Sequence, residues 1–400
     1  MTSLGRLRQP VPLIVSSIRP VLIALHVGFV VAGMATTLLG PILPALTLRW
    51  GMSDVVAGSL FTAQFLSSMS ATLVAPTLAA RVGARWALAL GFTLLALGIA
   101  TIGVAPHAVG VAATITYGLG LGLVLPLTNI AVAAAEPDRA ASALNLVNVS
   151  WAVGAVVWPL IVRALGTPAS VAGPTAALAI ACAAQAVACG VVVPRSLLTV
   201  RRDPANAPRA ETLAHPGLLR YALLYGTLIF LYVGTENSVA GWVAEFAHRM
   251  AAGATATTWA LAPTAFWAAL TAGRMMATLA LTRLREVALV RGGLAVATLG
   301  VLAITFGATT PKGVVLGSAV AGLGLSAIFP LLWAQVTRSV AVRAPGAAGP
   351  LYAAGGLGGA VMPWVVGAFS SAFGDLRAGL AVPLAALGIL LALSTPKQFR

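Results

Sequence analysis

Twelve long apolar runs dominate this sequence, and each is long enough to cross a lipid bilayer as a helix. A membrane-spanning chain must satisfy its backbone N–H and C=O groups internally, which helices do. Only 8% of the residues are charged, whereas a soluble domain carries about 25%. The runs therefore predict an all-α membrane protein with twelve transmembrane helices, at residues 20–46, 55–79, 86–105, 108–134, 142–166, 174–194, 218–246, 256–281, 288–308, 313–337, 349–373 and 378–394.

The basic residues predict the orientation of these spans. With both termini in the cytoplasm, 18 of the 24 Lys and Arg residues fall on the cytoplasmic side and five on the other, with Arg274 inside a span. Such a bias is typical of the cytoplasmic loops of membrane proteins. The basic residues are scattered between apolar runs, so the net charge of +15 indicates topology and not a nucleic-acid partner. We expect a multi-pass protein of the cell membrane whose residues 1–18 form a cytoplasmic tail.

The two halves of the chain repeat each other at an offset of about 200 residues. ARVGARWALALGFTLLALG, from Ala80, matches TRLREVALVRGGLAVATLG, from Thr282, and GLGLGLVLPL, from Gly118, matches GLGLSAIFPL, from Gly322. WAVGAVVWP, from Trp151, likewise matches GGLGGAVMP. We expect two pseudo-symmetric six-helix bundles at residues 1–194 and 217–400, joined by a cytoplasmic loop at 195–216. Parallel repeats of this kind predict a substrate site between them at mid-bilayer, open alternately to each side.

Six plus six spans, a basic central loop and short basic 2–3 and 8–9 loops resemble the major facilitator superfamily over the whole chain. The 2–3 loop, LAARVGAR, keeps Arg81, Gly83 and Arg85 of the family signature, while Ala80 stands where an Asp is usual. The resemblance implies the major facilitator fold. It also implies transport by alternating access, with Arg81, Arg85 and Arg283 as candidate gating residues.

A narrower resemblance is to the fucose-permease-like sugar branch. It rests on YVGTENSVAGW at 232–242, AGRMMATLALTRL at 272–284, GLGLVLPLTN at 120–129 and ALNLVNVSWAVGA at 143–155. The resemblance implies sugar transport by symport. However, Gly40 and Val124 occupy positions where proton-coupled fucose permeases carry acids.

Glu236 is the only charged residue in the apolar run 223–243. An ionised carboxylate inside a membrane is costly, so such residues are candidates for function. Its counterpart in the first half is Ala35, so the repeat does not require an acid there. Glu236 is predicted to accept hydrogen bonds from substrate hydroxyls, to carry a proton, or to do both. The alternative is a structural acid that caps a polar group of a neighbouring helix.

Depth along each span, counted at about 1.5 Å per residue, places Glu236 roughly 24 Å from the cytoplasmic end. The same count puts several polar and aromatic residues from both halves at this depth, namely Asn237, Thr36, Gln64, Trp158, Trp267 and Trp364. We predict that they bind substrate. Trp50, Trp86, Trp242 and Trp259 lie near span ends and are predicted to be interface anchors.

Arg274 is the only basic residue inside a span. Its count places it about 10 Å from the level of Glu236, so we do not expect a direct ion pair between them. Arg274 is predicted to face the inner cavity or to act in a gate. The alternative is that its side chain extends to the inner headgroups.

Asn129, Asn145 and Asn148 lie near the inner ends of spans four and five. Their amides can donate to and accept from sugar hydroxyls, and we include them among the substrate-binding candidates. Hydrogen bonding between helices is the alternative, because membrane proteins use Asn in this way. Cys182 and Cys189 lie seven residues apart on one helical face, as expected of small core residues.

The sequence favours a transporter that moves a small solute, a sugar above all, with protons as the candidate coupling ion. An exporter of hydrophobic or amphipathic compounds is the alternative, because the same fold with an apolar cavity would serve it. A membrane-embedded enzyme or receptor would need a catalytic cluster or a large domain outside the membrane, and the sequence has neither. We expect no enzyme activity, no cofactor, no metal site and no nucleic-acid partner. The expected partners are the solute and the lipid bilayer, and the expected state is a monomer.

Overall fold

The computed structural model describes residues 18–167, 169–194, 197, 216–251, 258–341 and 348–394. These residues are helical apart from short connections. The predicted cytoplasmic tail and nearly all of the predicted central loop lie outside the described residues. The first half contains α1 (Ile18–Thr36), α2 (Leu39–Trp50), α3 (Asp54–Val82), α4 (Ala84–Val104), α5 (His107–Ala135), α6 (Ala140–Leu165) and α7 (Ala172–Val192).

The second half contains α8 (Pro216–Met250), α9 (Leu261–Ala280), α10 (Glu286–Leu302), α11 (Pro311–Leu325), α12 (Ile328–Val336), α13 (Ala348–Phe373) and α14 (Leu376–Leu393). These helices form the twelve predicted spans, with two corrections. The first span is two helices, α1 and α2, and the tenth is also two, α11 and α12.

Both interruptions lie just before a proline. Pro41 and Pro330 have no N–H, so the carbonyls of Thr37 and Ser326 lose their usual intrahelical partners four residues on. The side-chain hydroxyls of the same two residues donate to carbonyls of the preceding turn. Thr37 Oγ1 donates to the Gly33 carbonyl at 3.1 Å, and Ser326 Oγ donates to the Leu323 carbonyl at 2.6 Å. The matching Pro126 lies within an unbroken α5, so proline alone does not decide the break.

Glycines bring corresponding helix pairs of the two halves into close contact. A Cβ at Gly33 of α1 would lie 2.0 Å from the Trp151 carbonyl oxygen on α6, and one at Gly154 would lie 1.9 Å from the Val30 carbonyl oxygen. In the second half, a Cβ at Gly358 of α13 would lie 2.1 Å from the Phe230 carbonyl oxygen on α8. Small residues permit such close packing in membranes, and here they do so at equivalent positions of the repeat.

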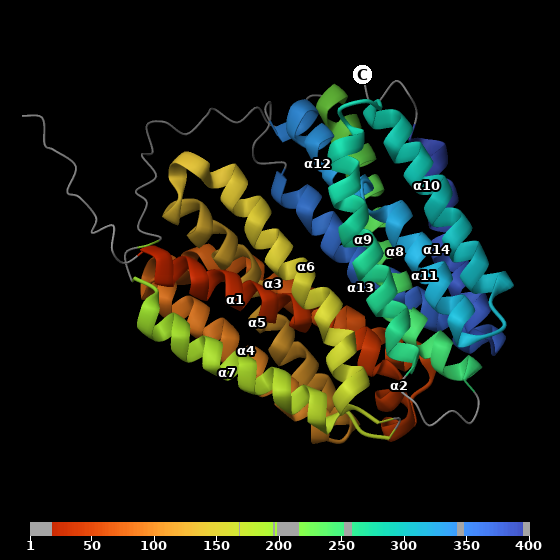
Figure 1. The fold of residues 1–400 in the computed structure, drawn as a ribbon, viewed down its shortest axis with the longest axis horizontal. Coiled ribbons are helices and arrows are strands. Elements are labelled where there is room, and N and C mark those ends of the chain that lie inside the picture. Colours follow the sequence, from red (N-terminus) through yellow and green to blue (C-terminus); the bar gives the residue numbers. More distant parts are fainter. Residues whose placement is uncertain are drawn as a thin grey trace, which may run out of the picture.

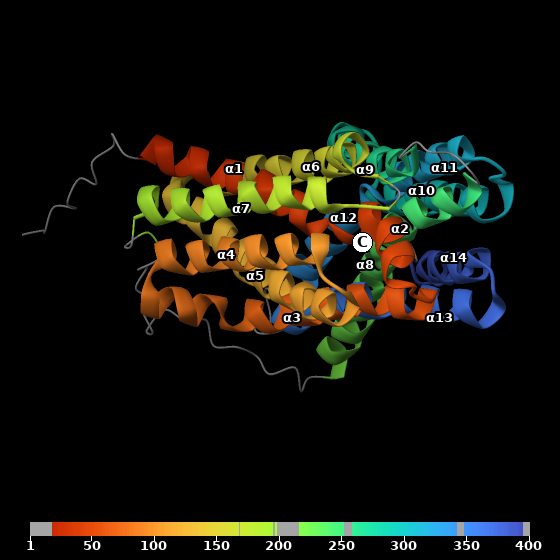
Figure 2. The same cartoon turned by 90° about the horizontal axis from the view of Figure 1, so that it is seen from below.

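The two halves lie side by side in Figure 1, with the first half in red to yellow-green and the second in green to blue. They meet where α3 packs on α13, α2 on α8 and α6 on α9, and Figure 2 shows α2 at this junction. Ten helical segments of the described residues are long and apolar enough to cross a membrane. The spans of α8 and α9 are not among them, because polar residues such as Glu236 and Arg274 lower their mean hydropathy. The expected boundaries of the two bundles, 1–194 and 217–400, stay a prediction.

Candidate functional site

Glu236 lies at the junction of α8, α9 and α11. The hydroxyl of Tyr232, one turn earlier on α8, donates a hydrogen bond to Glu236 Oε2. Arg274 on α9 approaches the same oxygen, with its Nη2 3.8 Å away. The Tyr232 hydroxyl also lies 3.1 Å from the carbonyl oxygen of Leu325, the last residue of α11. One donor and one cation therefore hold a carboxylate whose side chain is only 13% exposed.

The ion pair between Glu236 and Arg274 corrects the sequence expectation that the two residues lie too far apart. That expectation counted depth from the cytoplasmic end of each helix. The count assumed that the cytoplasmic ends of both helices lie at one level and ignored the length of the Arg274 side chain, and the contact shows that these assumptions together were wrong. The long Arg274 side chain extends to the carboxylate, which also argues against an extension of this side chain to the inner headgroups.

A pocket whose lining includes Asn237, the residue after Glu236, contains residues from both halves of the chain. Its empty volume is about 350 Å³, including the part open to solvent. Four of the predicted binding residues, Thr36, Gln64, Asn237 and Trp267, line it. The remaining lining residues are Thr37, Leu39, Gly40, Phe61, Phe65, Ala240 and Gly241. The lining is therefore a set of amides and hydroxyls enclosed by aromatic and aliphatic surface.

Hydrogen bonds fix the polar groups of this pocket. Gln64 donates from Nε2 to the Thr36 carbonyl at 3.2 Å and accepts at Oε1 from the Tyr117 hydroxyl at 2.7 Å. Asn237 donates to the Val233 carbonyl on its own helix at 2.8 Å. A carboxamide has two N–H donors and two acceptor lone pairs. Each amide therefore keeps hydrogen-bonding capacity for a polar solute while its position is fixed.

Two tryptophans from opposite halves meet beside the pocket. Trp151 of α6 and Trp267 of α9 pack edge to face, with ring centroids 5.6 Å apart. The indole N–H of Trp151 donates to Thr36 Oγ1 at 3.2 Å. The sequence interpretation included Trp267 and omitted Trp151. The repeat match WAVGAVVWP begins at Trp151 and could have indicated that this residue lies close to the other half of the chain.

The structure does not bring the other predicted binding residues into the pocket lining. Trp158 is fully buried, and its indole N–H donates to the Leu38 carbonyl at 3.1 Å. The Trp364 side chain is 42% exposed. Asn129 and Asn148 donate to carbonyls one turn earlier on their own helices, and Asn145 is exposed on α6. A role for these five residues in binding stays a prediction.

The predicted gating arginines lie apart from one another. Arg81 and Arg283 are exposed at helix ends, and Arg85 donates to the Val193 carbonyl at 2.8 Å. Their role in gating stays a prediction. Of the tryptophans predicted to be interface anchors, Trp86 is 48% exposed, but Trp242 and Trp259 are fully buried. The last two are not anchors, because their N–H groups donate to the Pro363 and Pro41 carbonyls inside the protein. Cys182 and Cys189 are buried and free, as predicted.

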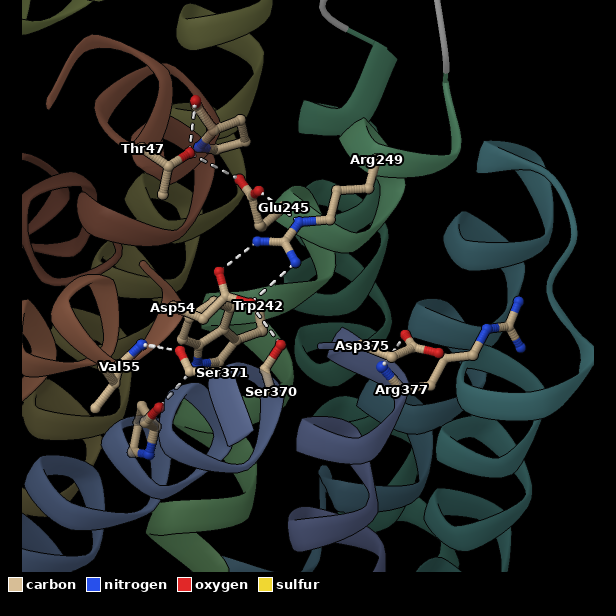
Figure 3. Close-up of polar contacts among 12 residues, drawn as sticks. Thr47, Asp54, Val55, Trp242, Glu245, Arg249, Ser370, Ser371, Asp375 and Arg377 are labelled. Carbon is tan, nitrogen blue, oxygen red and sulfur yellow. Dashed lines mark hydrogen bonds and ion pairs between the residues drawn. The ribbon is translucent and has the colours of Figure 1, made fainter. Parts of the chain in front are cut away.

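A second polar cluster joins the halves at the end of the molecule that the basic residues predict to face outside, which we call the outer end. It consists of Thr47, Asp54, Glu245, Arg249 and Ser370 (Figure 3). The sequence interpretation missed this cluster. Neither Asp54 nor Glu245 was singled out as a candidate, and no periodic pattern links α3 to α8.

The family profile of the Major Facilitator Superfamily matches residues 25–348. The chain belongs to this family. A search of curated proteins finds no match. The family fold also agrees with the helix order and with the position of the pocket between the halves.

Solved structures of superfamily transporters have the same fold as this chain. The nucleoside transporter NupG superposes with a TM-score of 0.73 at 13% identity, covering 94% of this chain and 97% of NupG. A bacterial homologue of the human lysosomal transporter Spinster, inward-facing and unoccupied, gives 0.74 at 15% identity, over 96% and 98% of the two chains. The Escherichia coli fucose:proton symporter FucP gives 0.58 at 16% identity, over 94% and 98%.

Proposed function

We propose that this superfamily transporter moves a small, uncharged polar solute, a sugar above all, across the cell membrane by alternating access. The observation that carries the proposal is the pocket that joins Thr36 and Gln64 of the first half to Asn237 and Trp267 of the second. Amides and hydroxyls can hydrogen-bond sugar hydroxyls, and an aromatic face packs on the apolar face of a sugar ring. The similarity to a fucose:proton symporter is in keeping with this solute class.

The charge balance supports an uncharged solute. Glu236 is already paired with Arg274 within the protein, so the site has no unmatched charge of its own to offer to an ionic solute. A buried charge without a partner would be costly. We therefore propose that Glu236 and Arg274 set the polarity of the site and that Asn237 and Gln64 contact the solute.

We further propose that Glu236 is the proton-coupling residue. The single proton of the Tyr232 hydroxyl has two acceptors within reach, Glu236 Oε2 and the Leu325 carbonyl. A protonated Glu236 needs no donor from Tyr232, which then donates to Leu325 beside the break between α11 and α12. Protonation would thus alter contacts between α8, α9 and α11 together.

The alternative is export of hydrophobic or amphipathic compounds. It is favoured by Leu39, Phe61 and Phe65, which line the same pocket. A screen of purified protein for thermal stabilisation, with sugars, polyols and lipophilic cations as ligands, separates the two functions. Stabilisation by a sugar supports the proposal, and stabilisation by lipophilic compounds alone would replace it with the exporter. The cell-membrane location, the cytoplasmic termini and the monomeric state are proposals as well.

A further inference from the structure

A bidentate ion pair connects the two halves at the outer end. Arg249 of α8 donates from Nη1 to Asp54 Oδ2 at 2.9 Å and from Nη2 to Asp54 Oδ1, so the guanidinium contacts both carboxylate oxygens (Figure 3). The Asp54 side chain is 10% exposed. Such a fork-to-fork contact has a fixed geometry and is stronger than a single neutral hydrogen bond.

Four further hydrogen bonds surround this pair. Ser370 of α13 donates to Asp54 Oδ2 at 2.5 Å, and the Val55 N–H donates to the Ser371 hydroxyl at 2.9 Å. The other two involve Glu245 of α8: Thr47 of α2 donates to Glu245 at 3.3 Å, and Arg249 Nε donates to Glu245 at 2.8 Å. Of these contacts, only the one between Arg249 and Glu245 lies within one half. All the others must break before the halves can separate at this end.

Glycines let the backbones of the halves touch beneath the ion pair. A Cβ at Gly367 of α13 would lie 2.2 Å from the Asp54 carbonyl oxygen, and one at Gly58 of α3 would lie 2.8 Å from Trp364 Cα. A Cβ at Gly40 of α2 would lie 2.8 Å from the Ala240 carbonyl oxygen on α8. The outer ends are therefore closed by backbone contact as well as by charge.

The close contact between α3 and α13 covers only the outer part of α3. Gly356 of α13 meets the Met69 side chain, a little past the middle of α3. One turn further inward, Leu73 is 80% exposed and Val74 is 52% exposed. The halves are thus closed at the outer end and diverge toward the inner end.

We infer that Asp54 and Arg249 form the latch that holds the outer entrance of the transport pathway shut. Glu245 is a positioning residue that stays with Arg249 when the latch opens. Opening deprives Asp54 of both Arg249 and Ser370, which come from the opposite half, and water replaces them. Arg249 keeps Glu245, one helical turn away on its own helix, so its charge is never left without a partner. This role does not depend on which solute is carried.

Cysteine labelling tests the latch without knowledge of the solute. Cys182 and Cys189 are the only cysteines, so their replacement by Ala gives a background for a reporter, Thr37→Cys, in the pocket wall. A membrane-impermeant maleimide is applied to right-side-out and to inverted vesicles. The parent reporter is expected to react from one side of the membrane. Asp54→Asn is expected to raise the labelling rate from the opposite side about tenfold, since a latch worth about 1.4 kcal/mol shifts an equilibrium tenfold.

A second variant opens the same interface without changing a charge. Gly367→Ala places a methyl group against the Asp54 carbonyl only while the halves are closed, so it is expected to raise labelling from the same side as Asp54→Asn. Gly322→Ala is the matched control, because its Cβ would also lie 2.2 Å from a carbonyl, that of Phe266, but within the second half. The control is expected to lower thermal stability and to leave the sidedness of labelling unchanged.

The labelling results test both the latch and the separate role of Glu245. Parental labelling in both Asp54→Asn and Gly367→Ala would overturn the latch. Glu245→Gln keeps the bidentate contact to Asp54 but weakens the contact that positions Arg249, so it is expected to raise labelling by less than Asp54→Asn. Opening by Glu245→Gln equal to that of Asp54→Asn would refute the positioning role. Size-exclusion profiles of all variants confirm that each compared protein is folded.

Discussion

Arg274 Nη2 of α9 lies 3.8 Å from Glu236 Oε2 of α8. These two residues carry the only charges in the middle of their helices, and they pair with each other. The contact is longer than a direct hydrogen bond. Tyr232 supplies that closer bond. The carboxylate is therefore balanced by Arg274 and positioned by Tyr232, and these two contributions can be separated by mutation.

A double-mutant cycle should measure the balance between the two charges. Removing one partner of a buried pair leaves the other uncompensated, whereas removing both is often neutral. We expect Arg274→Gln alone to reduce the unfolding free energy by about 1–3 kcal/mol, discounted for the partial exposure of Arg274. Glu236→Gln with Arg274→Gln should recover most of this loss. Thermal unfolding in detergent gives the comparison, and additive effects of the two substitutions would show that the residues do not interact.

Glu236→Gln should separate coupling from transport. The amide keeps the shape and an acceptor for Tyr232 but cannot release a proton. In proteoliposomes, we expect proton-driven accumulation to disappear and exchange of solute across the membrane to persist. Tyr232→Phe is the companion variant, which retains a titratable Glu236 and should therefore retain some accumulation. Accumulation by Glu236→Gln at the parental level would exclude Glu236 as the coupling site.

Asn237→Ala should weaken solute binding. Loss of one hydrogen bond costs about 1 kcal/mol, which corresponds to a roughly fivefold rise in Kd. Asn148→Ala is the control, because Asn148 lies outside the pocket lining and bonds its own helix. Titration of the compound that stabilises the parent protein gives both Kd values. Equal Kd values for the two variants would remove Asn237 from the binding site.

Gly358→Ala should destabilise the second half. Its methyl group would lie 2.1 Å from the Phe230 carbonyl oxygen, where neither backbone can yield easily. We expect a loss of about 1–3 kcal/mol, as for overpacking in a protein core. Gly388→Ala in α14 is the control, since a Cβ there meets nothing within 4 Å. The control should be neutral or slightly stabilising because Ala favours helix. Melting temperatures of the two variants distinguish the effects.

The sequence was sufficient to predict the twelve spans, because the bilayer demands about 20 apolar residues per helix and leaves a simple pattern. The repeat likewise predicted two similar halves, and the close backbone contacts at the equivalent positions Gly154 and Gly358 show why small residues recur there. The breaks at Thr37 and Ser326 were not predictable from proline alone, since Pro126 leaves α5 intact.

The site was predicted only in part, because depth along a helix is not position in space. Counting residues placed Thr36, Gln64, Asn237 and Trp267 in one layer, and these four line the pocket, while their role in binding solute stays a prediction. The same counting separated Glu236 from Arg274, because it assumed helices with aligned ends. It did not connect Asp54 with Arg249, although tertiary packing pairs them across 195 positions of the chain.

The glycine crossings also determine where this molecule can bend. At Gly33 and Gly358 the backbone of one helix rests on a carbonyl of the next, with no side chain between them that could change rotamer and absorb a displacement. A helix pair joined in this way transmits force as one stiff body. Mechanical compliance is then concentrated in the side-chain contacts between the halves, away from the backbone contacts at Gly40, Gly58 and Gly367. Each half therefore moves as a rigid body, and the conformational changes of a transport cycle take place at the interface between the two bodies.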